Sequence, residues 1–136
     1  MAFHTHPGLI QYKALQALPS DQPLDLLVQL RLRVEAIYPD GEIRSPAETY
    51  ALFNREVFGV LHRAGAHVLW RARPTLALVG PEQDRWDECF IRRFPSVEVY
   101  RSVLGDTEYT TANVHWDACV EDCRVTCLSV LSAAGI

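Results

Sequence analysis

The clearest pattern along the chain is a strict alternation of apolar and polar positions that begins at Leu24. The polar positions include Gln29 and Arg31, and the apolar positions form one continuous face: Leu24, Leu26, Val28, Leu30, Leu32 and Val34. A period of two residues is typical of a β-strand with one buried face. The run Tyr38-Pro39-Asp40-Gly41 then predicts a turn, because proline fixes φ and glycine adopts a positive φ without steric cost.

A helix is predicted to begin at Ser45. Ser45 is a suitable N-cap, Pro46 suits the first turn, and Glu48 completes a capping box three residues after the serine. Gly65 suits a left-handed C-cap. The apolar residues between these ends recur at helical spacing, so the helix is expected to cover the apolar face of the first strand: Tyr50, Phe53, Val57, Val60 and Leu61.

Three further strands are predicted by alternation. The first covers residues 66–73, is bent at Pro74 and resumes as an extended run over residues 76–79. The second covers residues 86–94 and forms a hairpin with it, and the last covers residues 124–130.

Two more helices separate the last two strands, a short one after Pro95 and a longer one over residues 108–122. The resulting order β-α-β-β-α-β predicts a ferredoxin-like α+β fold, a four-stranded antiparallel sheet with its helices on one face. Residues 1–22 are expected to form an N-terminal arm with a short helix over residues 8–18, and residues 23–136 the domain.

The other face of this sheet has no cover of its own. It carries Leu27, Leu69 and Ile91, with Val125 or Leu128, among its arginines. Leaving these residues in water exposes a large mixed apolar patch, so a second sheet must cover it. A two-fold homodimer with two sheets face to face, a dimeric α/β barrel, is the economical solution because its interface is self-complementary.

Composition narrows the class of protein. Of 136 residues, 49% are hydrophobic and 22% charged, with 13 Lys or Arg against 17 Asp or Glu and a net charge of −4. Such a chain is neither disordered nor a coiled coil. A sequence pI of about 5.7 without a basic stripe argues against a nucleic-acid partner. No apolar run is long enough to span a membrane, and the first residues lack a secretory pattern, so a cytoplasmic location is expected.

Three of the four cysteines have a spacing that resembles a set of metal ligands along a helix. They follow His115 at four-residue steps: Cys119, Cys123 and Cys127. On a helix each such step advances about 400°, so successive ligands drift apart around the axis. The pattern therefore favours small buried thiols over a metal site, and no metal, disulfide or cofactor is expected.

Two residues are the candidates for catalysis, His115 and Tyr109. A histidine can take a proton from an acidic carbon or phenol while a tyrosine hydroxyl polarises the adjacent carbonyl. The alternative is that His115 caps local backbone and Tyr109 packs in the core.

The candidate substrate-binding residues are Tyr50, Arg71, Trp86 and Arg92. The two arginines can hold a carboxylate or phenolate by forked hydrogen bonds. Ion pairs with Glu88 or Asp87 explain them equally well, and tryptophans are more often core or interface residues than substrate platforms.

Several segments together resemble a known group of proteins: Trp70–Arg73, Val79–Glu82, Trp86–Glu88, Arg92–Ser96, and Asp106–Tyr109 with His115. They are similar to domain-of-unknown-function family 1330, in the dimeric α/β-barrel superfamily, over residues 24–131. The chain departs from that pattern at Phe94, where tyrosine is usual, and at Trp116, where arginine is common. The resemblance implies the fold and the dimer. The superfamily includes cofactor-free monooxygenases, muconolactone isomerases, polyketide cyclases and haem-dependent enzymes, so the fold does not settle an activity.

No glycine-rich phosphate loop and no nucleophile elbow occurs in the sequence. Two functional hypotheses follow. The first is a cofactor-independent isomerase, cyclase or monooxygenase that acts on an aromatic or ketonic small molecule, with His115 as base. The second is a non-catalytic dimer that binds a small apolar or aromatic ligand.

Overall fold

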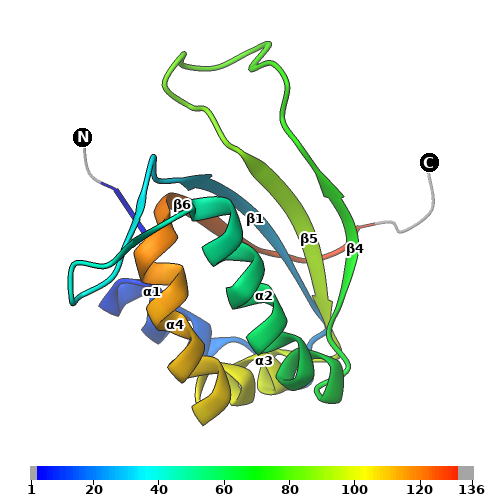
Figure 1. The fold of residues 1–136 in the computed structure, drawn as a ribbon. Helices are drawn as coiled ribbons and strands as arrows, with labels where there is room; N and C mark the ends of the chain where they lie inside the picture. Colours follow the sequence, from blue (N-terminus) through cyan, green and yellow to red (C-terminus); the bar gives the residue numbers. More distant parts are fainter. Residues whose placement is uncertain (1–2, 132–136) are drawn as a thin grey trace.

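The computed structural model describes residues 3–131 and contains one four-stranded antiparallel sheet. Its order is β4-β5-β1-β6, with bounds Leu24–Leu32 for β1, His67–Ala72 for β4, Glu88–Phe94 for β5 and Val120–Leu128 for β6. The first and third of these strands in chain order are therefore central, and the other two are edges (Figure 1). The α+β class and the four-stranded antiparallel sheet are confirmed.

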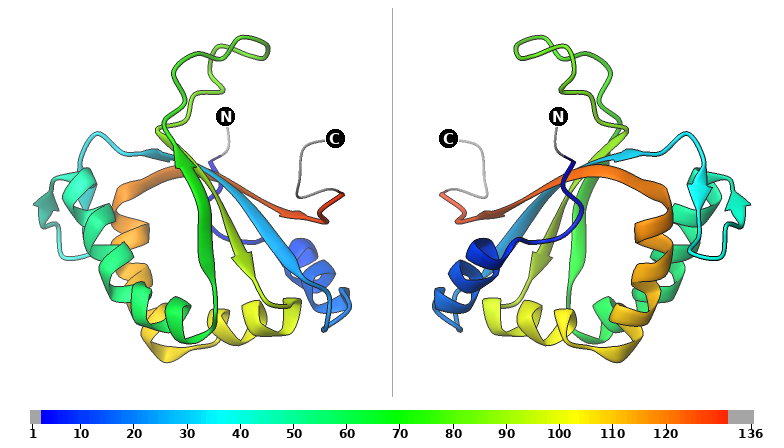
Figure 2. Two further views of the ribbon diagram at one scale, coloured as in Figure 1. Left: turned by 90° about the vertical axis from the view of Figure 1, so that its right-hand side faces the viewer. Right: turned by 90° about the vertical axis from the view of Figure 1, so that its left-hand side faces the viewer.

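Two helices lie side by side on one face of the sheet, α2 (Pro46–Arg63) and α4 (Thr107–Cys119), while the short α3 (Val97–Leu104) lies at one end (Figures 1 and 2). The predicted cap of α2 is confirmed, since the Ser45 hydroxyl accepts from the Glu48 N–H at 3.3 Å. Gly65, just past the helix, has a φ of 78°.

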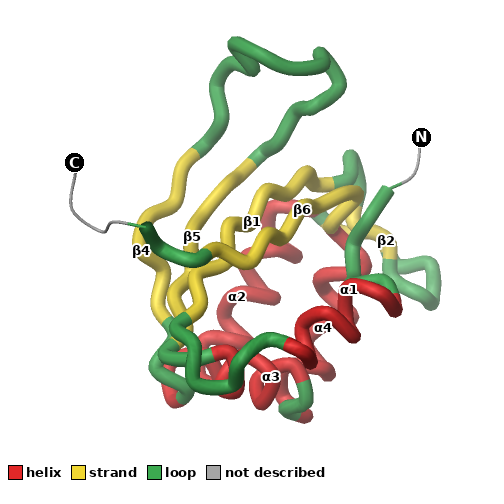
Figure 3. Tube along the Cα trace, turned by 180° about the vertical axis from the view of Figure 1, so that it is seen from behind, coloured by secondary structure: helices red, strands yellow, loops and turns green. Residues whose placement is uncertain are grey.

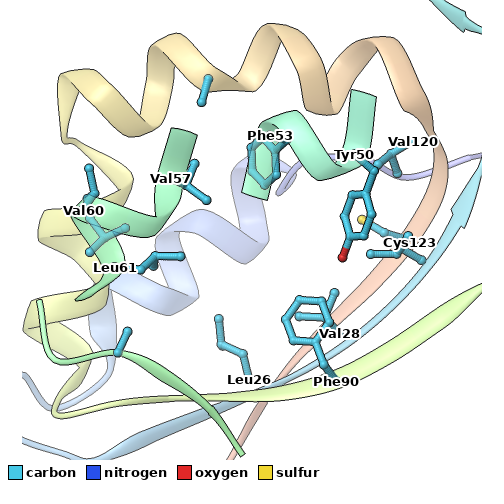
Figure 4. Packing of buried hydrophobic residues seen from close by; sticks show 14 of the residues in the cluster. Leu26, Val28, Tyr50, Phe53, Val57, Val60, Leu61, Phe90, Val120 and Cys123 are labelled. Carbon is cyan, nitrogen blue, oxygen red and sulfur yellow. The ribbon is translucent and has the colours of Figure 1, made fainter. Parts of the chain in front are cut away.

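The core lies between this helix pair and the sheet. Leu24, Leu26, Val28 and Leu30 of β1 are buried as the alternation predicts, and so are the five apolar residues expected on α2. Figure 4 shows Leu26 and Val28 of the sheet facing the buried side chains of α2.

The alternation of β1 ends earlier than predicted. Val34 is fully exposed, because the chain leaves the sheet after Leu32 and forms a small hairpin of β2 (Ala36–Ile37) and β3 (Ile43–Arg44). The expected turn lies at its tip, with Gly41 at a φ of 89° and its N–H donating to the Tyr38 carbonyl.

Two other boundaries differ from the sequence prediction. The extended run 76–79 is not a strand but part of a long loop, residues 73–87, because Pro74 has no N–H to offer a ladder and β5 begins only at Glu88. The helix expected to reach residue 122 ends at Cys119, and β6 starts at once with the buried Val120 opposite Leu32.

Residues 3–22 pack against the domain. The helix α1 (Leu9–Ala17) buries Leu15 in the main core, as its predicted position allows. Arg101 of α3 donates to the carbonyls of Leu15, Gln16 and Leu18, and so holds the C-terminal end of α1 against α3. The Trp116 indole donates to the Thr5 carbonyl at 3.1 Å, so the segment before α1 is also held.

The sheet face opposite α2 and α4, called the open face here, is less well covered. Figure 3 shows the strands from this side. Leu27 and Ile91 are partly exposed at its centre, and Trp70 of β4 is 45% exposed. These apolar side chains are the ones from which a second sheet is predicted.

Candidate functional site

Arg92 is a cation on the helix-facing side of the sheet. Its register partners are Leu26 of β1 and Val68 of β4, and Leu26 is buried beneath the helices. The guanidinium lies over the Phe90 ring, 5.0 Å from its centroid. Within residues 3–131 it forms no hydrogen bond and no ion pair, and burial lowers the pKa of Arg92.

Three tyrosines lie near enough to this guanidinium to affect its pKa, one each from α2, α3 and α4. Burial lowers the pKa of Arg92, whereas Tyr109, Tyr50 and Tyr100 each raise it by a smaller amount. Burial in turn raises the pKa of each tyrosine, so all three are neutral hydroxyl donors at neutral pH.

Aromatic packing fixes the rings of these tyrosines. Tyr100 lies 4.9 Å from Phe94 and Tyr109 lies 6.3 Å from Phe53, measured between ring centroids. Figure 4 shows Tyr50 extending from α2 with its hydroxyl toward the sheet. The site is therefore lined by rings and by neutral hydroxyls around one positive charge.

Glu88 completes the cluster at its β4 side. Its carboxylate accepts from the Tyr50 hydroxyl at 2.5 Å and from Arg71 Nη2 at 2.6 Å. Burial, and then Glu88 itself, raise the pKa of Tyr50. The charges of Glu88 and Arg71 cancel, so the cluster has one excess positive charge, that of Arg92.

Solvent reaches this side of the sheet at the β4 edge. Val68 and Arg71 pair with Arg92 and Phe90, so they share the helix-facing side, yet both are exposed. The helix layer is thus narrower than the sheet, and β4 extends beyond it (Figure 1).

The structure brings together four of the six residues singled out in the sequence: Tyr50, Arg71, Arg92 and Tyr109. It adds Tyr100, which the sequence did not single out, and it brings in Glu88 as the ion-pair partner of Arg71, an alternative that the sequence left open. A signal for Glu88 was present, because the alternation over residues 86–94 puts it on the same face as Phe90 and Arg92.

Trp86 lies elsewhere. It is buried, and the guanidinium groups of Arg31 and Arg124 lie 5.6 Å and 5.1 Å from its ring centroid. Both arginines occupy β-strand positions of the open face, opposite to the side of Arg92.

His115 has partners of its own. Its Nδ1 contacts the Tyr38 hydroxyl at 2.7 Å, and its Nε2 lies 3.2 Å from Glu56 Oε2. Six residues separate His115 from Tyr109 on α4, which turns their side chains about 120° apart around the axis. Tyr38 also lines a shallow groove of about 210 Å³ between the β2–β3 hairpin and α4, together with Arg33 and Asp117.

The three cysteines that follow His115 at four-residue steps are divided between a helix and a strand. Cys119 ends α4, Cys123 and Cys127 lie on β6, and all are free thiols. Burial raises the pKa of Cys119 and of Cys123 to about 11. Among residues 3–131, no three His, Cys, Asp or Glu side chains gather in a way that would hold a metal ion, and no helix is long and apolar enough to cross a membrane.

Comparison with known structures places the fold in a class. A dimeric protein of unknown function with a ferredoxin-like fold, from Bacteroides fragilis, is similar to the chain with a TM-score of 0.52. The alignment covers 82% of this chain and 100% of that one at 9% identity, so it shows the fold alone. The chain is an α+β protein of the ferredoxin-like class.

Two solved structures of one protein show the family. Methylated RPA0582 is 34% identical with a TM-score of 0.93, over 99% of this chain and 100% of that one. A second structure of RPA0582, a protein of unknown function from Rhodopseudomonas palustris, is 34% identical with a TM-score of 0.90, over 96% and 99% of the two chains. The chain belongs to the family of RPA0582. No family model and no curated protein matches the sequence, so membership of family 1330 stays a prediction.

Proposed function

We propose that the protein binds a small aromatic anion, a carboxylate or phenolate, between its sheet and its helices. The observation that carries the proposal is Arg92, a cation under the helices without a counter-ion among the described residues. Arg92 is half-buried, and withdrawing an unpaired charge from part of its water costs free energy that a bound anion offsets.

The surroundings of Arg92 favour a particular kind of anion. The hydroxyls of Tyr100 and Tyr109 can donate hydrogen bonds to an oxygen atom of the ligand. Because these hydroxyls are neutral, they do not compete with the ligand for the charge of Arg92. The rings of Phe53 and Phe90 offer apolar area to a flat ligand. The single excess charge matches a monoanion better than a phosphate.

Calorimetric titration with benzoate and with benzamide, its neutral analogue of the same shape, tests the proposal. We expect benzoate to bind at least about tenfold more tightly than benzamide, because only the carboxylate forms a charge-assisted pair with Arg92. Arg92→Gln should abolish this difference. Arg55→Gln, which removes an exposed arginine of α2, is the matched control and should leave it unchanged.

Equal affinity of the wild-type protein for benzoate and benzamide would contradict the proposal. So would a benzoate affinity that Arg92→Gln and Arg55→Gln lower to the same extent, since that result indicates only the loss of general positive charge.

We also propose that the protein is a homodimer in which two open faces pack together as an α/β barrel. The partly exposed Leu27 and Ile91 and the 45% exposed Trp70 support this assembly. The ferredoxin-like protein from Bacteroides fragilis is described as dimeric. Two-fold symmetry lets one apolar surface serve as its own partner.

A second candidate function is a cofactor-independent isomerase, cyclase or monooxygenase with His115 as base. The contacts of His115 favour this alternative, because the Glu56 carboxylate lies 3.2 Å from Nε2, where it stabilises the positive charge that the imidazole gains when it takes up a proton, and the Tyr38 hydroxyl contacts Nδ1. Tyr38, which faces Nδ1, lines the neighbouring groove. Here Tyr38 takes the position at His115 that sequence reasoning gave to Tyr109.

Deuterium uptake from D₂O at the acidic carbon of 2-tetralone, an aromatic ketone, tests this candidate by NMR. A base at His115 removes the carbon proton, and solvent returns a deuteron to the enolate. We expect exchange above the buffer rate, its loss in His115→Gln, and unchanged benzoate affinity in that variant. Exchange at the buffer rate, or exchange that survives His115→Gln, would rule out this role.

A further inference from the structure

The loop between β4 and β5, residues 73–87, extends beyond the sheet as an arm (Figures 1 and 3). Its outgoing half carries Leu76, Leu78 and Val79, which are 75%, 84% and 93% exposed. Three large apolar side chains within four positions are an unusual concentration for a solvent-exposed loop. The outgoing half of the arm is therefore an exposed apolar surface of the kind that binds another protein surface.

The returning half of the arm is fixed to the domain. Asp87 accepts from the Leu32 N–H at 2.7 Å and donates its own N–H to the Leu30 carbonyl at 2.8 Å. Arg31 donates to the Arg85 carbonyl at 3.0 Å, and Trp86 is buried beside it. These contacts hold the root of the arm, so the apolar outgoing half is presented at a defined end of the sheet.

The arm leans toward the open face. In both views of Figure 2 its tip lies on the side of the sheet away from α2 and α4. The apolar residues of that face, Leu27, Ile91 and Trp70, therefore border the same space as the arm. Whatever molecule covers the open face will also meet the arm.

We propose that the arm clasps a second copy of this chain seated on the open face. Every copy presents both surfaces, so a single two-fold axis covers two arms and two open faces at once, whereas an unrelated partner would have to match both separately. Pro74 and Pro81, which lack backbone N–H groups, limit a strand in the arm to residues 75–80, which favours side-chain packing over an added strand as its mode of contact. The inference rests on the proposed homodimer and assigns to it a second contact region.

Sedimentation velocity over a range of concentrations tests the clasp. The wild-type protein is expected to sediment as a dimer, twice the 15.4 kDa of one chain. The triple variant L76S/L78S/V79S should raise the dimer dissociation constant by about 100-fold, since three apolar side chains then lose their burial. The control E82S/Q83S/D84S alters the tip of the same arm without touching an apolar residue and should dissociate like the wild type.

The outcomes separate the clasp from the dimer itself. A monomeric wild-type protein overturns both, whereas a dimer whose affinity survives L76S/L78S/V79S overturns the clasp alone. Isotope-filtered NMR on dimers mixed from labelled and unlabelled chains gives a direct check. Methyl protons of Leu76 and Leu78 should show NOEs to the other chain, and their absence in a stable dimer would also overturn the clasp.

Discussion

Replacement of Asp122 by Asn is expected to lower the free energy of unfolding by about 2 to 3 kcal/mol at pH 7, because it removes one charge from a buried hydrogen-bonded network. Asp122, at the start of β6, is 2% exposed. Its Oδ1 accepts from the His4 N–H at 2.9 Å and from Arg124 at 2.7 Å, and Arg31 lies 3.5 Å from its Oδ2. An amide keeps the shape of this side chain but removes the counter-ion of Arg124, and it leaves Arg31 with Glu121, 2.7 Å away, as its remaining partner.

The same variant should change the response to acid. Burial alone raises the pKa of Asp122, but the His4 N–H, Arg124 and Arg31 together outweigh it, so the pKa lies below its ordinary value. A carboxyl whose pKa is lower in the folded state stabilises the protein above its unfolded pKa, about 3.9, and loses that contribution as the pH falls through the folded pKa. The gap in stability between the wild type and Asp122→Asn should therefore shrink below about pH 4.

Urea denaturation at pH 7 and at pH 2.5 measures both effects. Asp21→Asn, at an exposed aspartate, is the control and is expected to change stability by less than about 0.5 kcal/mol at either pH. A gap between the wild type and Asp122→Asn that is equal at the two pH values would show that the charge of Asp122 does not stabilise the fold.

This network also explains why the first residues belong to the fold although their sequence has no period. The Cys123 N–H donates to the His4 carbonyl at 2.7 Å, and Phe3 lies over the Arg31 guanidinium. Both contacts join the first residues of the chain to strands that are distant in sequence. No local sequence pattern indicates contacts with residues this far away along the chain. The sequence alone therefore predicts only an N-terminal arm without periodic apolar positions.

The predictable parts of the fold are those in which local pattern and burial agree. Strand β1 was predictable because its apolar face is covered along almost its full length, and α2 because Ser45 caps it and one side of it is buried. The run 76–79 has the apolar content of a strand but no neighbouring strand within the described chain. Periodicity detects apolar side chains, and it does not tell whether they pack within one chain or against another.

Part of the candidate site was also predictable from the sequence. Alternation over residues 86–94 places Arg92 on the face that the helices cover, and this placement needs no tertiary information. The neighbours of His115 are different, because Tyr38 comes from a hairpin 77 residues earlier and Glu56 from another helix. The spacing of His115 and Tyr109 along α4 could not indicate that Tyr38 or Glu56 contacts His115.

Replacement of Trp86 by Ala is expected to lower the free energy of unfolding by about 3 kcal/mol, the usual cost of removing a large buried aromatic side chain. Trp86 is 7% exposed, and its ring lies against the guanidinium groups of Arg31 and Arg124 at the root of the arm. Trp86→Phe keeps an aromatic face for both arginines and should cost less than half as much. Chemical denaturation of the two variants measures these changes.

Benzoate affinity in the same variants separates packing from ligand binding. Trp86 lies with arginines of the open face, whereas Arg92 lies on the helix-facing side, so the sheet separates the two groups. Well below their melting temperatures, Trp86→Ala and Trp86→Phe should bind benzoate within about twofold of the wild-type affinity, a difference of about 0.4 kcal/mol. A tenfold loss of affinity in a stably folded Trp86→Phe would instead make Trp86 part of the binding site. The sequence-based assignment of Trp86 to substrate binding would then stand, and the anion would have to contact both sides of the sheet or lie at its edge.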